Sequence, residues 1–322
     1  MSMQYYSRLI RCLIATSMAA LLVACGGGDG DDGDSTGTAS LSLTDAPVDG
    51  AKEVVVRFDG AEFKAPDGDR IMFYLSDTTG TGTCEVVDIH DPDNPCAINL
   101  MDYQNGETVT LLDNVSLPAG KHNWVRLILN DAPGLGPGYI ILLDDSLFDL
   151  RVPSGAQTGL KLHSGFIVAA DNHTNYTIDF DLRKSVHDPV GSSDYILRPS
   201  LRIMDNSEVG TLSGTVHSSF FEGGGCTGAV YVFPDGTPDA PDDEDGDGGG
   251  PDPITTVLVP DDGTHGYEVG FLTEGDYLIA FTCDALADNP EVNDDGTVGF
   301  LSEASVHITA GEIEFYDFPA AP

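Results

Sequence analysis

Basic residues are scarce in this sequence. Its 322 residues include 14 lysines and arginines against 53 aspartates and glutamates, which gives a formal net charge of −39 at pH 7. Arg8 and Arg11 lie in the first stretch of the chain, and the remainder carries 12 basic and 53 acidic residues, a net charge of −41. A surface this acidic repels nucleic acid and anionic lipid headgroups, so we expect neither as a partner. It suits multivalent cations, cationic partners or a salty habitat.

Tryptophan and helical periodicity are also nearly absent. Past residue 38, apolar residues alternate or bunch in short runs between Gly, Pro, Asn and Asp clusters, which predicts an all-β protein. The strongest strand prediction covers residues 122–129 and contains Trp124, the single tryptophan. We expect Trp124 to pack in the core; the alternative is a platform for stacking a glycan.

A second strand is predicted over residues 176–182, where Ile178 and Phe180 alternate with Asp179 and Asp181. Alternate residues of a strand are about 6–7 Å apart, a spacing in the range of glycosidase carboxylates. A glycosidase pair normally flanks a cleft, however, and one tryptophan leaves little surface for stacking sugars. We therefore expect a solvated or turn-bonded face there.

The start of the chain has the composition of a secretory signal. Arg8 and Arg11 precede an apolar run, Leu13–Val23, that is too short to cross a bilayer as a helix. The four residues Leu22–Cys25 resemble the lipobox of bacterial lipoproteins, and the Gly/Asp-rich run that follows is typical of a flexible tether. An ordinary secretory signal with a coincidental cysteine, or a membrane-buried stub, would not require such a tether.

The lipobox resemblance implies a signal peptide over residues 1–24 and a linker over 25–37 that begins with a lipid-bearing Cys25. It also implies an anchor in the lipid bilayer of the cell envelope. Lipoproteins retained at the inner membrane commonly have aspartate at the second position, where this chain has Gly26. The resemblance therefore favours the outer membrane of a Gram-negative bacterium.

Six cysteines divide by position. Cys12 lies in the signal and Cys25 at its end, while the other four fall into two regions. Because an exported chain meets an oxidising compartment, we expect two disulfides, pairing Cys84 with Cys96 and Cys226 with Cys283. A zinc site is disfavoured because neither pair has close C-x-x-C spacing.

Several spaced motifs resemble the lipoprotein domain catalogued as domain of unknown function 4382. They are Leu41–Pro47, Leu117–Gly120, Val152–Gly155 with Thr158–Leu162, Ile178–Asp181 with Ser185-Val186, and Leu197–Pro199. The resemblance implies a β-sandwich over residues 38–206 and no assigned activity. The cysteine-bearing stretch between Leu75 and Met101 departs from the family pattern and is expected to be an enlarged loop.

Composition changes at Asp205–Glu208, where we expect a hinge. Seven short strands are predicted beyond it, at 211–217, 229–233, 254–259, 267–271, 276–283, 302–308 and 312–318. Motifs such as Gly266–Val269 and Leu272–Ile279 resemble a carboxypeptidase regulatory-like (transthyretin-like) domain. That resemblance implies a second, accessory sandwich over residues 207–322. Its acidic insertion, residues 234–253, is expected to be a long surface loop or disordered.

That insertion contains a partial calcium motif. Asp243, Asp245 and Asp247, followed by Gly248, match the first six positions of an EF-hand loop, whose alternating carboxylates converge on a hard cation. The twelfth position should supply a bidentate glutamate but is Ile254. We expect at most weak calcium binding, in the ~10⁻⁴–10⁻³ M range of extracellular modules; the alternative is a solvated acidic loop. No other cofactor is required.

Catalytic motifs are missing from the sequence. It contains no G-x-S-x-G elbow, no H-E-x-x-H and no phosphate-binding glycine loop. His163 lies beside Ser164, and together with His173 and His187 forms no metal spacing, so turns and surface histidines are the better interpretation. We expect a non-enzymatic module of the cell envelope that serves adhesion, envelope structure or the capture of an unknown protein or glycan partner. The alternative is a hydrolase, or an accessory subunit of a secreted hydrolase, that acts on envelope or extracellular polymers.

Overall fold

A computed structural model describes residues 35–46, 50–76, 84–87, 96–130, 136–153, 159–188, 194–237, 252–288 and 298–320. Strands dominate, and the helices are single turns: η1 Leu100–Asp102, α1 Leu182–Ser185, η3 Ser218–Phe220 and η4 Ala285–Ala287. The prediction of an all-β fold is confirmed. Residues Thr36–Pro322 form one compact unit. None of the helices in the described ranges has the length and apolar character needed to cross a membrane.

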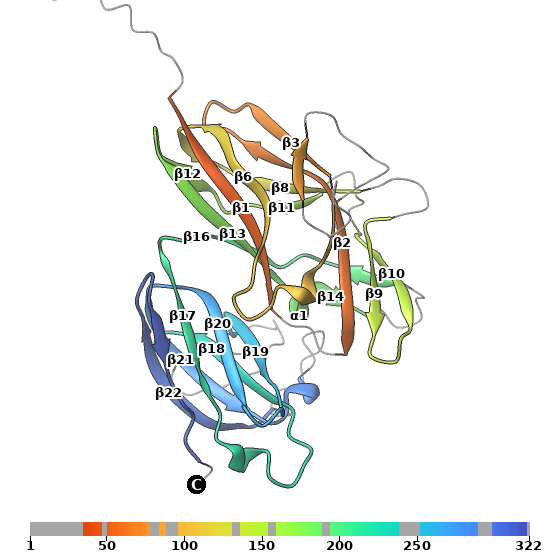
Figure 1. Ribbon diagram of the computed structural model, residues 1–322, viewed down its shortest axis with the longest axis vertical. Coiled ribbons are helices and arrows are strands. Elements are labelled where there is room, and N and C mark those ends of the chain that lie inside the picture. Colours follow the sequence, from red (N-terminus) through yellow and green to blue (C-terminus); the bar gives the residue numbers. More distant parts are fainter. Residues whose placement is uncertain are drawn as a thin grey trace, which may run out of the picture. The chain divides into compact units, whose positions relative to one another are not determined.

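A four-stranded sheet contains the first strand of the fold at its centre. Its order is β16 (Leu201–Asp205), β13 (His173–Asp181), β1 (Thr36–Ala46) and β6 (Val109–Pro118). β1 runs parallel to β13, with Leu43 opposite Ile178, and antiparallel to β6 (Figure 1). Leu41 and Leu43 alternate along β1, so their side chains point to the same face of the sheet, where both are buried in the core.

The second, ten-stranded sheet is organised around the long strand β2 (Ala51–Lys64), which pairs with four other strands. They are β3 (Arg70–Ser76), β5 (Cys96–Asn99), β8 (Val125–Leu129) and β9 (Gly138–Leu142). The remaining members are β4 (Glu85–Val87), β10 (Leu147–Arg151), β11 (Leu160–Leu162), β14 (Val186–His187) and β15 (Tyr195–Leu197). The stretch expected to be an enlarged loop thus contains two short strands, β4 and β5.

The two sheets share one apolar core, as expected for a β-sandwich. Val54, Val56 and Phe58 of β2 are fully buried in the same cluster as Leu43 of β1 and Phe180 of β13. The alternation predicted for β13 is confirmed on this inner face, where Ile178 and Phe180 are fully buried. Burial of such side chains contributes roughly 1.5–3 kcal/mol each.

The strand predicted over residues 122–129 is interrupted. β7 (Gly120–His122) pairs with β12 (Phe166–Val168) in a separate two-stranded sheet, whereas β8 pairs with β2. Hydrogen bonds from Lys64 N to Trp124 O and from Asn123 N to Lys64 O hold the crossing between the sheets. Trp124 lies at this break, half-buried and outside the apolar core, so the prediction that it packs in the core is wrong.

The C-terminal strands form two further sheets, β20–β17–β23 and β19–β18–β21–β22. All seven predicted strands are present: β17 (Val209–Thr215), β18 (Gly228–Pro234), β19 (Thr255–Val259), β20 (Gly266–Thr273), β21 (Gly275–Thr282), β22 (Phe300–Ile308) and β23 (Ile313–Phe315). Leu212, Val232 and Ile279 meet in a core between the two sheets. Tyr267, which follows Gly266, is buried in that core.

The segment expected to be a hinge is a hydrogen-bonded turn. The Asp205 carboxylate accepts hydrogen bonds from the Ser207 backbone N–H at 2.9 Å and its hydroxyl at 2.6 Å. Asn206 N donates to Asn175 O, and Glu274 N donates to Glu208 O. These hydrogen bonds lie at the connection from β16 to β17, and a hinge at this position stays a prediction.

Candidate functional site

The carboxylate pair on β13 is built into the protein interior. Asp179 is buried, and its carboxylate accepts a hydrogen bond from Arg202 Nε of the neighbouring strand β16 at 2.6 Å. Burial raises the pKa of Asp179 although Arg202 favours its charged form. Asp181 caps α1 by accepting from Lys184 N at 3.1 Å. The expectation of a solvated face is therefore wrong for Asp179, which is buried. The expectation of a carboxylate bonded to a turn is confirmed for Asp181.

Asp45 of β1 lies next to this pair and has no direct partner. Both of its carboxylate oxygens are buried without a hydrogen bond among the described residues. Burial, with the negative charges of Asp179 and Asp181, raises its pKa well above the ordinary 3.8. The Leu182 N–H and the Gln104 amide favour the charged form, but neither reaches hydrogen-bonding geometry.

A cavity of about 30 Å³ adjoins these two buried carboxylates. Its walls include Asp45, Asp179 and Arg202, with Thr256 and Glu268 of the C-terminal strands. Space of this size holds a water molecule or two. The arrangement can place ordered water between buried charges, but it has no room for a substrate.

Arg183 of α1 forms an ion pair whose two side chains are almost fully buried. Its guanidinium donates to the Tyr231 hydroxyl and to Ala285 O, each at 2.8 Å, and lies 3.2 Å from the Asp288 carboxylate. Burial raises the pKa of Tyr231 well above its ordinary value. Lys184 donates to Pro253 O at 2.8 Å. The sequence offered one signal for these contacts, the adjacent basic residues Arg183 and Lys184 in a chain with few cations, and our sequence analysis missed it.

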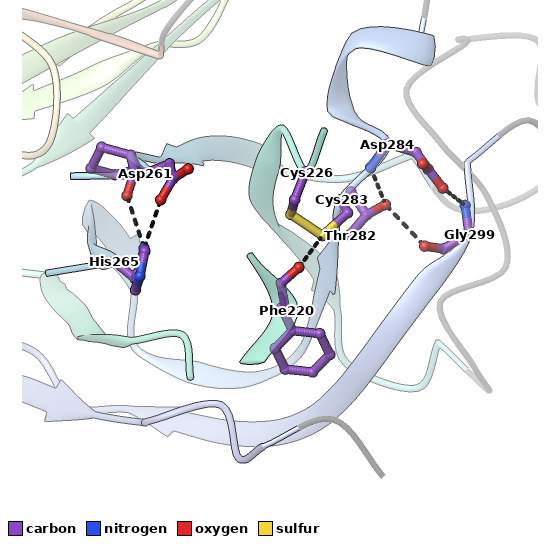
Figure 2. Close-up of a disulfide and its surroundings, with 9 residues drawn as sticks. Phe220, Cys226, Asp261, His265, Thr282, Cys283, Asp284 and Gly299 are labelled. Carbon is purple, nitrogen blue, oxygen red and sulfur yellow. Dashed lines mark hydrogen bonds and ion pairs between the residues drawn. A yellow bond between two sulfur atoms is a disulfide. The ribbon is translucent and has the colours of Figure 1, made fainter. Parts of the chain in front are cut away.

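Both predicted disulfides are present. Cys84 and Cys96 are joined with their Cα atoms 5.4 Å apart, and Cys226 and Cys283 with theirs 4.5 Å apart. Figure 2 shows the second bond between the start of β18 and the end of β21. The Cys283 sulfur contacts Phe220 O at 3.6 Å. A disulfide sulfur carries no hydrogen, so this contact is not a donated hydrogen bond.

The surroundings of the Cys226–Cys283 disulfide are tightly bonded. Thr282 Oγ1 donates to Gly299 O at 2.9 Å and accepts from Asp284 N at 3.0 Å. His265 stacks on Phe221 with ring centroids 4.1 Å apart. Its Nδ1 lies 3.3 Å from Pro260 O and 3.9 Å from Asp261 Oδ1, toward which it points in Figure 2. These contacts fix the ends of β18, β19 and β21.

A groove of about 440 Å³ runs beside this disulfide. It is lined by two amides, a hydroxyl, a carboxylate and apolar groups: Gln104, Asn105, Cys226, Thr227, Gly228, Leu258, Val259, Pro260 and Asp261. None of these lining residues is a histidine, a lysine or a free thiol. Such a set can bind a ligand through hydrogen bonds and apolar contact, but it offers no nucleophile with an adjacent base.

The histidines considered in the sequence do not converge among the described residues. His163 is exposed between β11 and β12, and His173 at the start of β13 bonds to Thr38 at 2.9 Å and to Asn175 at 3.0 Å. His187 lies in β14. Within the described ranges no cluster of His, Cys, Asp or Glu is arranged to hold a metal.

Several predicted site residues lie outside the described residues. They are the lipidation site Cys25 and the calcium candidates Asp243, Asp245 and Asp247. Lipidation and calcium binding both stay predictions.

The fold and its buried ion pairs define an all-β sandwich protein with disulfide-stapled strands. Residues 36–199, about half of the chain, match the family described as "Domain of unknown function (DUF4382)", and the chain belongs to this family. No curated protein matches the sequence.

Solved structures resemble the chain only distantly. The Bacillus anthracis TIE protein is 12% identical, with 88% of this chain and 33% of that one covered and a TM-score of 0.20. A streptococcal ancillary pilin is 11% identical, with coverages of 88% and 61% and a TM-score of 0.19. A putative cell adhesion protein from Bacteroides fragilis is 11% identical, with coverages of 87% and 92% and a TM-score of 0.21. The chain spans less than two thirds of the first two, and at these TM-scores the likeness carries no functional argument.

Proposed function

We propose that this protein is a lipid-anchored, non-enzymatic module of the bacterial cell envelope that captures a partner or contributes to envelope structure. The observation that supports the non-enzymatic part of the proposal is the Asp179–Arg202 ion pair. Asp179 and Asp181 were the best catalytic candidates in the sequence, and both are committed to contacts inside the fold. A carboxylate held this way is unavailable as a general base for a bound substrate.

The anchor rests on the lipobox-like Leu22–Cys25 and the Gly/Asp-rich run after it. A lipoprotein cysteine carries three acyl chains, and two already give stable anchoring. Gly26 at the second position favours the outer membrane of a Gram-negative bacterium. In this proposal residues 207–322 are a carboxypeptidase regulatory-like sandwich with an accessory role, supported by the Gly266-Tyr267 step and the buried Tyr267.

A hydrolase, or an accessory subunit of one, is the alternative. It is favoured only by the Asp179–Asp181 spacing and by the groove beside Cys226. The groove supplies binding contacts, which serve partner capture as well as substrate binding.

The non-enzymatic proposal is tested by incubating full-length protein in detergent with a panel of ester, glycosidic and peptide substrates. Asp179→Asn and Asp181→Asn variants are assayed beside it, and the melting temperature of each is recorded. We expect no turnover above that of buffer. Turnover that Asp179→Asn abolishes while the melting temperature stays the same would establish the hydrolase instead.

Partner capture is tested in cells with a photo-crosslinking residue at Asp261, which is exposed on the groove. The same residue at Asp149, exposed on β10, is the matched control. We expect a reproducible adduct from position 261 that position 149 does not give. Identical adducts from both positions would argue against the groove as the capture surface.

A further inference from the structure

Positive charge is concentrated around the single tryptophan. Of the 12 basic residues beyond the signal, three place their charged groups over the Trp124 ring. The distances to the ring centroid are 4.6 Å for Lys161 Nζ, 5.1 Å for Arg126 Cζ and 5.6 Å for Arg70 Cζ. Energetically significant cation–π contacts occur about once per 70–80 residues, so three on one ring are unusual. We call Arg70, Trp124, Arg126 and Lys161 the Trp124 cluster.

Strand register brings these side chains together. Arg126 of β8 lies directly opposite Lys161 of β11 on one side and Glu62 of β2 on the other. Since alternate residues point to opposite faces, all three lie on one face of the sheet, and their neighbours Val125 and Leu127 lie in the core. Arg70 of the adjacent strand β3 lies opposite Lys64, two positions along β2 from Glu62, and is therefore on the same face. Figure 1 shows β3 beside β2.

The backbone leaves room for the arginine stem. Gly159, with φ +59, lies where a Cβ would come within 3.0 Å of Arg126 Cγ. A larger residue would be strained there and would displace the arginine. Arg126 is accordingly held close to the sheet, with its side chain only 20% exposed.

One carboxylate balances the three cations. Glu62 lies 3.2 Å from Arg126 Nη1 and 3.5 Å from Arg70 Nη1. Within the described part of the chain, Lys161 has no carboxylate at ion-pair distance. The Trp124 cluster is therefore locally cationic on a protein whose net charge is −39.

We propose that the Trp124 cluster binds an acidic saccharide, one whose sugar rings carry carboxylate or sulfate groups. Arginine forks and a lysine ammonium donate charge-assisted hydrogen bonds to such oxyanions. Glu62, whose side chain is only 9% exposed, orients the two arginines rather than contacting the ligand. The part of the indole that stays exposed adds apolar surface beside the cations. This inference rests on the proposed binding function and names its ligand class.

The charge of the whole protein favours a saccharide over denser polyanions. A surface of net charge −39 repels nucleic acid and anionic bilayers, whose charges are closely spaced. A ligand with isolated acidic groups meets the cationic cluster and little of the surrounding repulsion.

Intrinsic fluorescence tests this site directly because Trp124 is the only tryptophan. Full-length protein in non-ionic detergent is titrated with a short oligogalacturonate and with its neutral methyl ester. We expect the acid to change the emission saturably, more weakly as salt rises, and the ester to have no effect. Lys161→Gln should weaken binding roughly tenfold, the value of one charge-assisted hydrogen bond.

Lys52→Gln is the matched control. It removes one positive charge from an exposed pair with Asp145 at the far end of β2, and it should leave the affinity unchanged. Melting temperatures show whether either variant alters the fold. Equal weakening by both variants would overturn the proposal, as would equal binding of the methyl ester or no saturable change at ~10 mM oligogalacturonate.

Other anions are further arms of the same titration. Inorganic sulfate, duplex DNA or anionic vesicles competing as well as the oligogalacturonate would overturn the saccharide assignment. This titration involves neither the substrate panel nor the membrane anchor. A failure to bind the oligogalacturonate would therefore overturn the ligand assignment alone and is distinguishable from a failure of the proposed function.

Discussion

At the scale of single residues, Arg183 is expected to contribute most to stability. Its partner Asp288 has a side chain with 0% exposure, so Arg183→Ala leaves a buried carboxylate without a cation. Breaking a buried pair in this way costs about 3–5 kcal/mol of the free energy of unfolding. Urea unfolding of the variant checks this, with Lys52→Ala as a control at an exposed pair that should change stability little. Equal effects from both variants would contradict the role of Arg183.

Asp45 is expected to make stability depend on pH. In the unfolded chain it ionises near its ordinary pKa of 3.8, whereas burial and the charges of Asp179 and Asp181 raise the folded pKa well above that. The folded state then holds the proton more tightly, so its stabilisation is present below pH ~4 and is lost as pH rises through the folded pKa.

Asp45→Asn should therefore flatten this fall and be no less stable than the wild type at neutral pH. Urea unfolding measured from pH 4 upward checks the slope, and Asp149→Asn, at an exposed position, is the control. An Asp45→Asn variant with the pH dependence of the wild type would show that Asp45 is not the group responsible.

Residue-level roles were only partly predictable from the sequence. The alternation along β13 correctly placed Asp179 and Phe180 on opposite faces of the strand. It carries no information about Arg202, because β13 and β16 pair only in the folded sheet. Asp45 lies in the Leu41–Pro47 motif, where an acidic residue at the end of an apolar strand was the available signal. The Trp124 cluster depends on the register of β2, β8 and β11, which no local pattern specifies.

At the scale of secondary structure, the Cys226–Cys283 disulfide joins the ends of the adjacent strands β18 and β21. It closes a sequence separation of 57 residues, for which chain entropy gives a stabilisation of about 4 kcal/mol. A Cys226→Ser/Cys283→Ser variant should lose about 2–5 kcal/mol in urea unfolding under non-reducing conditions. Unfolding at the wild-type urea concentration would contradict this.

Element existence was more predictable than element boundaries. Seven short runs gave β17–β23 because turn residues separate them, and β13 followed from strict alternation. The break between β7 and β8 was not visible, since His122–Leu129 is apolar enough for one continuous strand. Two sheets compete for that segment, and only their pairing with β12 and β2 decides where it divides.

At the scale of the whole molecule, the proposed function depends on the lipid anchor predicted at Cys25. Without the anchor, the acidic sandwiches have no reason to associate with a membrane, because their charge repels anionic headgroups. In the proposed function, acyl chains on Cys25 therefore supply the affinity for the bilayer.

The most direct measurement is cell fractionation of the wild type and Cys25→Ser, with membranes washed in high salt and processing followed by mass. The account predicts that the wild type stays with the washed membranes and leaves only in detergent. Cys25→Ser should be soluble or remain unprocessed, and Cys12→Ser, within the signal, should behave as the wild type. A Cys25→Ser protein that is cleaved and still bound to salt-washed membranes would contradict the account.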